Sequence, residues 1–328
     1  MPPADLPGSR PGEAEGTRNV AGAAAPGETE GTRNVAGAAA PGETEGTRNV
    51  AGAAAPDGLP SRAVDSVLDA LDPDRDRPTN VMETSGLCLS FGGKPVLSSI
   101  DMQFVRGTIT ALIGPTGSGK STFLRSLNRM NDKVAGFRHE GDATLEGRSI
   151  WAPGTDLLDL RRRVGMLFQR PNPFPMSIRD NVVAGVRAHR IAKGKQLDVV
   201  AEQRLREVGL WDAVKDRLND SPFRLSGGQQ QLLCLARALA VGPDVLLLDE
   251  PTSSLDPIST EYVEAMLAEL VPALTLIVVT HNLGQARRVS DRAMFFYDGR
   301  LVEHGRTEDL FERPASPQTE RYVMGRFG

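Results

Sequence analysis

The sequence predicts an α/β fold for residues 81–328, in which buried parallel strands end along one edge of a sheet. Two observations lead to this prediction. A β-rich run at 108–113 is followed by a glycine-rich loop and then by a helical pattern up to residue 130. Two apolar runs, 245–248 and 275–280, are too short for typical helices and end in polar residues. Open α/β sheets bind their ligands at such strand ends.

The first 80 residues differ in composition and are predicted to be a disordered tail. They contain no Phe, Trp, Tyr or Lys, and Gly and Pro account for 21 of the 80. Residues 11–25, 26–40 and 41–55 are copies of one 15-residue unit, too short and too poor in apolar residues to stack as a solenoid. A repeated docking peptide is the functional alternative. Four apolar residues at the spacing of one helix face also allow a short docking or transient helix: Val64, Val67, Leu68 and Leu71.

Charge and cysteine content argue against several classes of protein. The formal charge is −4 overall, and the first 80 residues contribute −6 of it, with 7 Arg against 13 acidic residues. The remaining +2 does not point to a nucleic-acid binder. Cys88 and Cys234 lie far apart among apolar neighbours, which favours core packing in a reduced protein over a disulfide. No apolar run is long enough to span a membrane, so any membrane role is expected to come through partners.

A phosphate-binding P-loop is predicted at residues 114–122, GPTGSGKST. It follows a strand and opens a helix, which is the setting that a P-loop requires. Its glycines let backbone N–H groups turn inward, and the positive end of the helix faces the phosphates. Lys120 is expected to reach the β and γ phosphates, and the Ser121 hydroxyl to ligate Mg²⁺. The predicted ATP-binding residues of the loop are Gly114, Pro115, Thr116, Gly117, Ser118, Gly119, Lys120, Ser121 and Thr122.

Polar residues at three strand ends are predicted to complete the reaction site. Asp249 is expected to hold Mg²⁺, and Glu250, the next residue, to polarise the attacking water. His281 is predicted to donate a hydrogen bond to the γ-phosphate. Gln169 closes the strand 164–168, where its amide can contact Mg²⁺ or the lytic water without adding a charge. A merely solvated or structural strand end is the alternative for each residue.

The segment LSGGQQQ at 225–231 predicts a second helix start that binds an anion. Ser226 is a good N-cap, and two glycines before the helix 232–240 expose backbone N–H groups. Because the P-loop already supplies one such site for the γ-phosphate, this one is expected to complete a site on another copy of the chain. The residues predicted to contact ATP in that way are Leu225, Ser226, Gly227, Gly228 and Gln229.

The order of these motifs resembles that of an ATP-binding cassette (ABC) ATPase. The P-loop, Gln169, LSGGQ, the strand before the two carboxylates, SSLD at 253–256 and His281 follow one another as in that family, over residues 83–312. The resemblance implies a P-loop NTPase (RecA-like) core with an antiparallel β subdomain. It also implies an inserted α-helical signature subdomain, at about 170–240, within a nucleotide-binding domain that covers 81–328.

The same resemblance implies partners and two further site residues. The family forms a head-to-tail homodimer with two ATP molecules at its interface, each bound with Mg²⁺. Phe91 matches the aromatic position that stacks on adenine, for which a Phe suffices. Asp256 matches the D-loop residue that communicates across the dimer.

Finer features resemble one subfamily, the ATPase subunits of phosphate-specific transport (Pst) importers, of the PstB type. The resemblance is carried by LNRMND (127–132), NPFPMSIRDNV (172–182), LLLDEPTSSLDPIST (246–260), VTHNLGQARRVSD (279–291) and GRFG (325–328). It implies a peripheral subunit on the cytoplasmic face of the cell membrane that couples ATP hydrolysis to phosphate import. Two permease subunits and an extracytoplasmic phosphate-binding protein are the implied partners. Leu232, where the family usually has Arg, is expected to modulate the rate, and the repeat tail is foreign to the family.

Several alternatives remain open at this point. An importer for another solute, such as a phosphonate or an amino acid, would carry the same ATPase motifs. A non-transport ABC ATPase fits less well, because one cassette is present and only 106 residues separate Lys120 from Ser226, with no sustained heptads. Residues 171–178 are expected to form a stiff apolar knob for a membrane partner, or else a packed turn. The segment after the helix predicted at 307–312 is too short for a regulatory domain.

Overall fold

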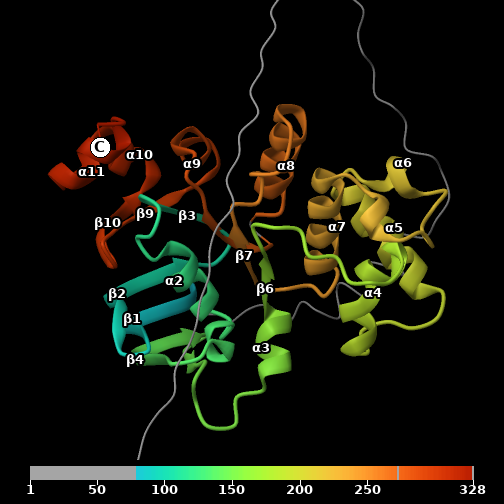
Figure 1. Ribbon diagram of the computed structural model, residues 1–328, viewed down its shortest axis with the longest axis horizontal. Helices are drawn as coiled ribbons and strands as arrows, with labels where there is room; N and C mark the ends of the chain where they lie inside the picture. Colours follow the sequence, from blue (N-terminus) through green and yellow to red (C-terminus); the bar gives the residue numbers. More distant parts are fainter. Residues whose placement is uncertain (1–78, 272, 327–328) are drawn as a thin grey trace, which may run out of the picture. The chain divides into compact units, whose positions relative to one another are not determined.

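The protein is described by a computed structural model that covers residues 79–271 and 273–326 (Figure 1). The three repeats, the candidate helix at 64–71 and all but the last two residues of the predicted tail lie outside these residues. The described chain folds into two β-sheets with helices packed around them. The predicted α/β class is therefore confirmed.

The larger sheet has six strands, in the spatial order β10 (Arg300–Arg306), β9 (Arg292–Tyr297), β3 (Ile109–Ile113), β8 (Thr275–Val279), β7 (Val245–Asp249) and β6 (Val164–Leu167). All neighbours run parallel except β10, which is antiparallel to β9. Every residue of β3, β7 and β8 is buried, as expected for strands covered on both faces. The carboxyl ends of β6, β7 and β8 consequently lie next to one another at one edge.

The smaller sheet is antiparallel and has the order β2 (Lys94–Val105), β1 (Asn80–Phe91), β4 (Phe137–Leu145) and β5 (Arg148–Ser149). Alternate residues of β1 and β2 are buried, because one face of this sheet packs on the core and the other does not. Leu89 and Leu97 belong to the same buried cluster as Leu112 of the larger sheet. The antiparallel β subdomain implied by the family resemblance is thus present.

Four helices gather beyond β6, on the side of the larger sheet away from β2 and β1 (Figure 1). They are α4 (Ile178–Ala188), α5 (Gln196–Glu207), α6 (Trp211–Val214) and α7 (Gly227–Leu239). Val182, Val186, Leu205 and Leu233 are fully buried in their shared core. The Ser177 hydroxyl caps α4 by accepting from the Asp180 N–H, which satisfies one of the free N–H groups of that helix end.

The remaining helices flank the sheets, and two of them differ from the prediction. They are α2 (Lys120–Ser126), α3 (Leu157–Arg163), α8 (Pro257–Glu269), α9 (Leu283–Val289), α10 (Thr307–Glu312) and α11 (Pro317–Val323). The helix predicted to run to residue 130 ends at Ser126, and Arg129 then adopts a positive φ of 59°, which an α-helix cannot contain. The helix α11 was not predicted. Two prolines surround its start, although Pro317 stands at a position of the first turn that tolerates proline.

The two cysteines differ in burial. Both cysteines are free; Cys234 is buried and Cys88 is half-buried. Cys234 packs in the core of the α4–α7 helices. Among the described residues, no helix combines the length and the apolar character needed to cross a membrane.

Candidate ATP-binding and hydrolysis site

The predicted P-loop joins β3 to α2 through glycines whose backbone conformations favour glycine. Gly114, Gly117 and Gly119 have φ angles of 142°, 82° and 99°, which L side chains rarely adopt. A Cβ on Gly114 would overlap the carbonyl oxygen of Phe296, and one on Gly119 would overlap the side chain of Leu97. The loop therefore needs glycine both for its conformation and for its close packing against β9 and β2.

Lys120 is the first residue of α2 and lies buried beneath the loop, with 8% of its surface exposed. Its Nζ donates to the carbonyl oxygens of Gly114 at 2.7 Å and Pro115 at 2.8 Å. Burial lowers the pKa of the Lys120 ammonium, whereas the negative charges of Glu250 and Asp249 act to raise it. The loop thus holds a buried cation beside two carboxylates. Such a cation can form charge-assisted hydrogen bonds with phosphate oxygens.

Asp249 ends β7, is 1% exposed and has a partner for each carboxylate oxygen. Its Oδ1 accepts from the Ser121 hydroxyl at 2.8 Å, and its Oδ2 pairs with the Arg125 guanidinium at 3.0 Å. Ser121 and Arg125 are four residues apart on α2, so they lie on the same helix face. Sequence reasoning brought Ser121 and Asp249 to one site but missed Arg125, which stands outside any motif. A hydroxyl and a carboxylate are hard oxygen donors of the kind that Mg²⁺ prefers.

The three residues predicted to be catalytic meet at a single oxygen atom. Glu250 Oε2 accepts a hydrogen bond from Gln169 Nε2 at 2.9 Å and lies 3.1 Å from His281 Nδ1. They follow β7, β6 and β8, whose order in the sheet makes the three strand ends neighbours. Glu250 has a positive φ of 49° and donates its N–H to the carbonyl oxygen of Val279 at 2.9 Å. This turn directs Glu250 and Asp249 to different partners.

A buried network beside His281 was not predicted, although Thr280, Gln285 and Thr252 lie in stretches that carry the family resemblance. Gln285, 3% exposed, accepts from the Thr280 hydroxyl at 2.7 Å. Its Nε2 donates to Thr252 Oγ1 at 2.9 Å and to Glu264 Oε1 at 3.1 Å. The network joins the end of β8, the segment after Glu250 and helix α8. It restrains the backbone on either side of the catalytic candidates, because buried polar groups with every partner in place rigidify a core.

The LSGGQ segment begins α7 with a capping box. The Gln229 N–H donates to Ser226 Oγ at 3.3 Å, and the Ser226 N–H donates back to Gln229 Oε1 at 3.2 Å. Leu225 is buried, whereas Ser226 and Gly227 are exposed. Gly228 lies against the SSLD loop, since a Cβ there would be 3.1 Å from the Leu255 side chain. The helix starts five residues earlier than predicted, at Gly227.

The signature segment and the P-loop are separate within one chain. Figure 1 shows α2 and α7 on opposite sides of β6 and β7. Among the described residues, no hydrogen bond connects residues 225–229 to residues 114–122. The two segments predicted to contact phosphate are therefore not brought together within one chain.

Phe91 and Asp256, singled out by the family resemblance, occupy element ends. Phe91 ends β1, is half-buried, and its ring centroid lies 5.5 Å from that of Phe137 on β4. Asp256 is the exposed N-cap of α8 and accepts from the backbone N–H groups of Ile258 and Ser259. The hydrogen bond from the Ser259 hydroxyl, at 2.6 Å, lowers the pKa of Asp256. The Asp256 side chain thus faces solvent as a charged group.

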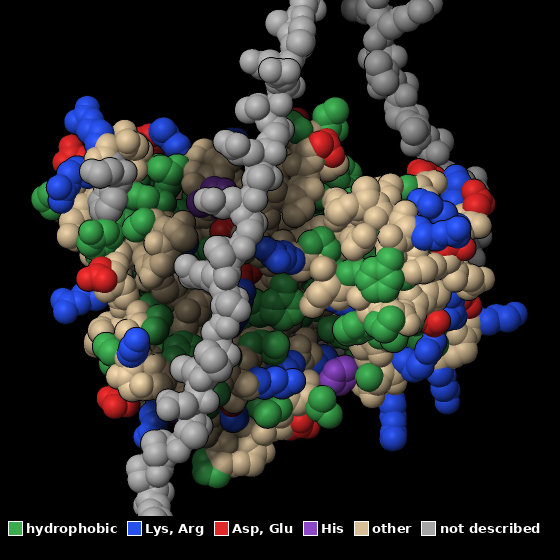
Figure 2. Space-filling model, viewed as in Figure 1, with side chains coloured by type: hydrophobic (Ala, Val, Ile, Leu, Met, Phe, Trp, Pro, Cys, Tyr) green, Lys and Arg blue, Asp and Glu red, His purple; other side chains and the backbone are tan. Residues whose placement is uncertain are grey.

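The predicted knob at 171–178 is held by helices yet presents apolar side chains to solvent. Phe174 and Met176 are 42% and 40% exposed. The Arg237 guanidinium on α7 lies 4.1 Å above the Phe174 ring, and Asn181 on α4 accepts from the Phe174 N–H at 2.7 Å. Figure 2 shows hydrophobic side chains at the surface over α4 and α7. The segment combines features of both alternatives, since it is a fixed turn with an exposed apolar tip.

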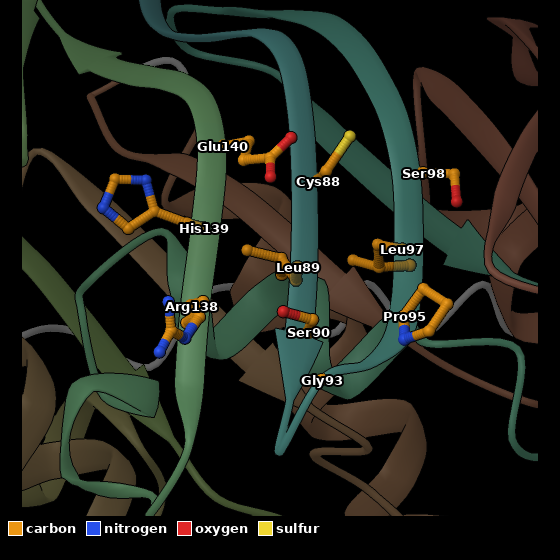
Figure 3. Close-up of a pocket in the computed structure, with 10 residues that line it drawn as sticks. All are labelled: Cys88, Leu89, Ser90, Gly93, Pro95, Leu97, Ser98, Arg138, His139 and Glu140. Atoms are coloured by element: carbon orange, nitrogen blue, oxygen red, sulfur yellow. The ribbon is translucent and has the colours of Figure 1, made fainter.

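A separate hollow of about 600 Å³ lies on the antiparallel sheet (Figure 3). None of the residues predicted for the ATP site lines it. The polar side chains around it come from facing strands, with Cys88 paired with Glu140 and Ser90 paired with Arg138. In Figure 3 the side chain of His139 points to the other side of β4, where it stacks on Trp151 at 4.0 Å. The hollow therefore belongs to the antiparallel sheet and not to the P-loop.

Comparison with known proteins agrees with this geometry. A sequence model of the ABC transporter family matches residues 97–253, which include the P-loop and the signature segment. A solved bacterial Atm1-family ABC exporter with ATP bound has a similar fold, with a TM-score of 0.65 and 22% identity. That match covers 78% of this chain and 43% of the exporter chain, and at this identity it supports the fold alone.

Two curated relatives share far more of the sequence. Phosphate import ATP-binding protein PstB 2 of Mycobacterium tuberculosis is 63% identical over 255 residues, which cover 78% of this chain and 92% of the relative. Phosphate import ATP-binding protein PstB of Mycobacterium intracellulare is 65% identical over 242 residues, covering 74% and 85%. Identity at this level over most of the relatives' length shows that the chain belongs to the PstB family of phosphate import ATP-binding proteins, within the ABC transporters.

Proposed function

We propose that the chain is the ATP-binding and ATP-hydrolysing subunit of an ABC importer for inorganic phosphate. The observation that carries the proposal is the meeting of Gln169, Glu250 and His281 at one carboxylate oxygen, next to a P-loop with a buried lysine. The solute itself is taken from the PstB relatives, because an ATPase of this kind does not contact the cargo. We assign residues 81–328 to one nucleotide-binding domain and about 170–240 to its helical signature subdomain.

The P-loop binds the phosphates of ATP in this proposal. Lys120 exchanges its hydrogen bonds with the carbonyls of Gly114 and Pro115 for bonds with the β and γ phosphates. These bonds are stronger, because donor and acceptor are then both charged. The N–H groups of residues 116–122 face the same oxygens. Phe91 supplies an aromatic face for adenine at the edge of β1. The negative charges of Glu250 and Asp249 favour the charged form of Lys120.

Glu250 polarises the attacking water and His281 donates a hydrogen bond to the γ-phosphate. Gln169 and His281 contact the Oε2 atom of Glu250, so in this proposal the water hydrogen-bonds to the Oε1 atom of the same carboxylate. Gln169 then orients the water or the metal through its amide without adding a charge.

The metal proposed for this site is Mg²⁺, which enters with ATP and neutralises phosphate charge during hydrolysis. The residues that would hold it are Ser121, Asp249 and Gln169. The fit rests on the Ser121 hydroxyl and the Asp249 carboxylate, which already lie 2.8 Å apart. Within the described residues no cluster of three His, Cys, Asp or Glu side chains could hold a metal by itself. Mg²⁺ that relies on nucleotide phosphates for several ligands requires no such cluster.

Two copies of the chain are proposed to assemble head to tail. The signature residues 225–229 of one copy would complete the site at the P-loop of the other, and Asp256 would lie near that interface. The separation of the two segments within one chain supports this assembly. ATP binding closes the dimer, and hydrolysis assisted by Glu250 opens it again.

The dimer is proposed to act as a peripheral assembly on the cytoplasmic face of the cell membrane. Its partners there are two permease subunits and, through them, an extracytoplasmic phosphate-binding protein. The exposed Phe174 and Met176 are the proposed contact for a permease segment. Their loop lies close to Gln169 in the sequence and is tied to the signature helix by Arg237. Movement of the signature helix would therefore reach the membrane subunits.

Substitution of Glu250 tests the catalytic assignment. Glu250→Gln should keep ATP binding and lower hydrolysis by about 10²–10⁴-fold, since a neutral amide cannot accept the proton. The variant should also accumulate an ATP-bound dimer in size-exclusion chromatography. Glu261→Gln, an exposed change on α8, is the matched control. Normal turnover in Glu250→Gln would remove Glu250 from its proposed role.

Reconstitution tests the solute and the partners. Vesicles that contain the chain, the two permeases and the binding protein should show ATPase activity that phosphate stimulates. A phosphonate or an amino acid that stimulates in its place would identify the alternative importers. Phe174→Ser should reduce this stimulation more than it reduces the ATPase activity of the isolated chain, because it removes the proposed permease contact as well as the ring that packs on Arg237. Stimulation equal to that of the native chain would exclude Phe174 from that contact.

A further inference from the structure

The helix α11 contacts the first residue of the P-loop through one tyrosine. The Tyr322 hydroxyl oxygen accepts a hydrogen bond from the backbone N–H of Gly114 at 3.2 Å, across 208 residues of sequence. We propose that Tyr322 is a positioning residue of the ATP site, which holds Gly114 in the conformation that phosphate binding requires. This inference rests on the proposed ATP-binding function of the same loop.

Gly114 is the point at which β3 becomes the P-loop, and both of its backbone polar groups are engaged. Its N–H donates to Tyr322, and its carbonyl oxygen accepts from Lys120 at 2.7 Å. Its φ of 142° is open to glycine alone. When Lys120 turns toward phosphate, it releases the Gly114 carbonyl oxygen. The hydrogen bond that the Gly114 N–H donates to Tyr322 then remains to restrain Gly114.

The tyrosine ring is itself fixed by packing. It stacks on Phe295 of β9 with ring centroids 4.9 Å apart and an interplanar angle of 24°. Phe295 and Ala111 of β3 belong to one buried cluster, against which Tyr322 packs. Burial raises the pKa of the Tyr322 hydroxyl, and the Gly114 N–H acts in the opposite direction. The hydroxyl therefore stays protonated near neutral pH, and its position relative to β3 is set by the ring.

The start of α11 is held in turn by β10. Glu303 on β10 accepts hydrogen bonds from the backbone N–H groups of Ala315 at 2.8 Å and Ser316 at 3.0 Å. Ser316 caps the helix by accepting from the Gln318 N–H at 3.2 Å. The helix is thus tied to the larger sheet at its beginning, through Glu303, and near its end, through Tyr322. A short helix that would be marginal alone gains its order from these contacts.

Removing the Tyr322 hydroxyl tests the proposed contact with the Gly114 N–H. Tyr322→Phe keeps the ring stack on Phe295 and deletes the acceptor for the Gly114 N–H. We expect the Kd for ATP to rise about two- to tenfold, the range of one hydrogen bond, with kcat at saturating ATP unchanged. In the nucleotide-free protein, hydrogen exchange of the peptide that contains Gly114 should become faster.

Tyr262→Phe is the matched control, because the Tyr262 hydroxyl also bonds to a backbone group, the carbonyl oxygen of Glu207 at 3.1 Å. Tyr262 lies on α8, whereas the hydrogen-bond partner of the Gly114 N–H lies on α11. It should change neither the ATP affinity nor the exchange at Gly114. The two variants should have similar unfolding midpoints, so that lost stability cannot explain a difference in binding.

The inference fails if Tyr322→Phe leaves both the Kd and the exchange rate at Gly114 at their native values. Weaker ATP binding without faster exchange would also overturn it, since the effect would not pass through the Gly114 N–H. Should the native chain bind no ATP, the proposed function fails by itself. The exchange rate at Gly114 still decides in that case whether Tyr322 restrains the loop.

Discussion

The P-loop and the signature helix start are both candidates for phosphate contact, but they are built in different ways. Lys120 is buried and already has two carbonyl partners within its own loop. Ser226 and Gly227 are exposed, and the capping box satisfies only the helix end itself. The P-loop is therefore preorganised by its own chain, whereas the signature segment presents an open surface. This difference supports a composite site between two copies.

Lys120→Ala should produce the largest change in ATP binding, because it removes the buried cation from the preorganised P-loop. We expect the Kd for ATP to rise by at least about 30-fold, since charge-assisted hydrogen bonds to two phosphates are lost. Isothermal titration with ATP measures this. Lys215→Ala, which removes an exposed lysine paired with Asp212, should bind ATP normally. Equal affinity in both variants would contradict the role of Lys120.

Ser226→Ala tests the exposed signature segment. It should leave ATP binding to the isolated chain unchanged but lower steady-state hydrolysis about tenfold, because the partner's site loses a polar contact and the helix start loses its cap. Ser177→Ala removes an equivalent cap from α4 and controls for helix stability. If Ser177→Ala reduces hydrolysis as much as Ser226→Ala, the signature serine acts only as a helix cap.

Glu146→Gln should have the smallest effect of these substitutions. It provides a baseline, because Glu146 lies outside both the P-loop and the signature helix start. Burial alone would raise the pKa of Glu146, but hydrogen bonds from Arg163 and Arg106 outweigh it and lower the pKa below its usual 4.5. The ion pairs therefore stabilise the fold above about pH 4.5, and this stabilisation is lost as the pH falls through the lowered value. The substitution should reduce the unfolding free energy by about 1 kcal/mol at pH 7.

Chemical denaturation at a series of pH values from 7 downwards measures this effect. The difference between the native chain and Glu146→Gln should shrink as the pH falls through the lowered pKa of Glu146, because the native carboxylate then becomes neutral as well. Glu202→Gln, which breaks an exposed pair with Arg206, should cost less at pH 7. A difference that stays constant with pH would show that Glu146 contributes by packing and not by charge.

The residues predicted from sequence reach the site because local patterns imply their position. Ser121 begins a helix behind a glycine loop, and Asp249 ends an apolar run. Strand ends of a parallel sheet share one edge, so Gln169, Glu250 and His281 are expected together once their strands are recognised. Their meeting at one oxygen atom also needed the positive φ of Glu250. That backbone turn has no signature in a single sequence.

The residues that sequence reasoning missed act through contacts between distant segments. Arg125 follows the P-loop motif by one helical turn, and only its distance to Asp249 shows its role. Gln285 lies in a stretch that carries the family resemblance, but only its three hydrogen-bond partners show that it joins separate segments. The helix α11 was not predicted, because its segment contains two prolines and few apolar residues. Its order comes from contacts with Glu303 and Phe295 instead.

Local sequence by itself determined the P-loop, the strands that end at the site, the family and the chemical types of the site residues. Glycine spacing and apolar runs suffice for these, since they act over a few neighbouring residues. Tertiary structure alone decided which carboxylate faces Ser121, which faces Gln169 and His281, and that Tyr322 contacts Gly114. Such pairings depend on strand order and on side-chain packing, which join residues far apart in the chain.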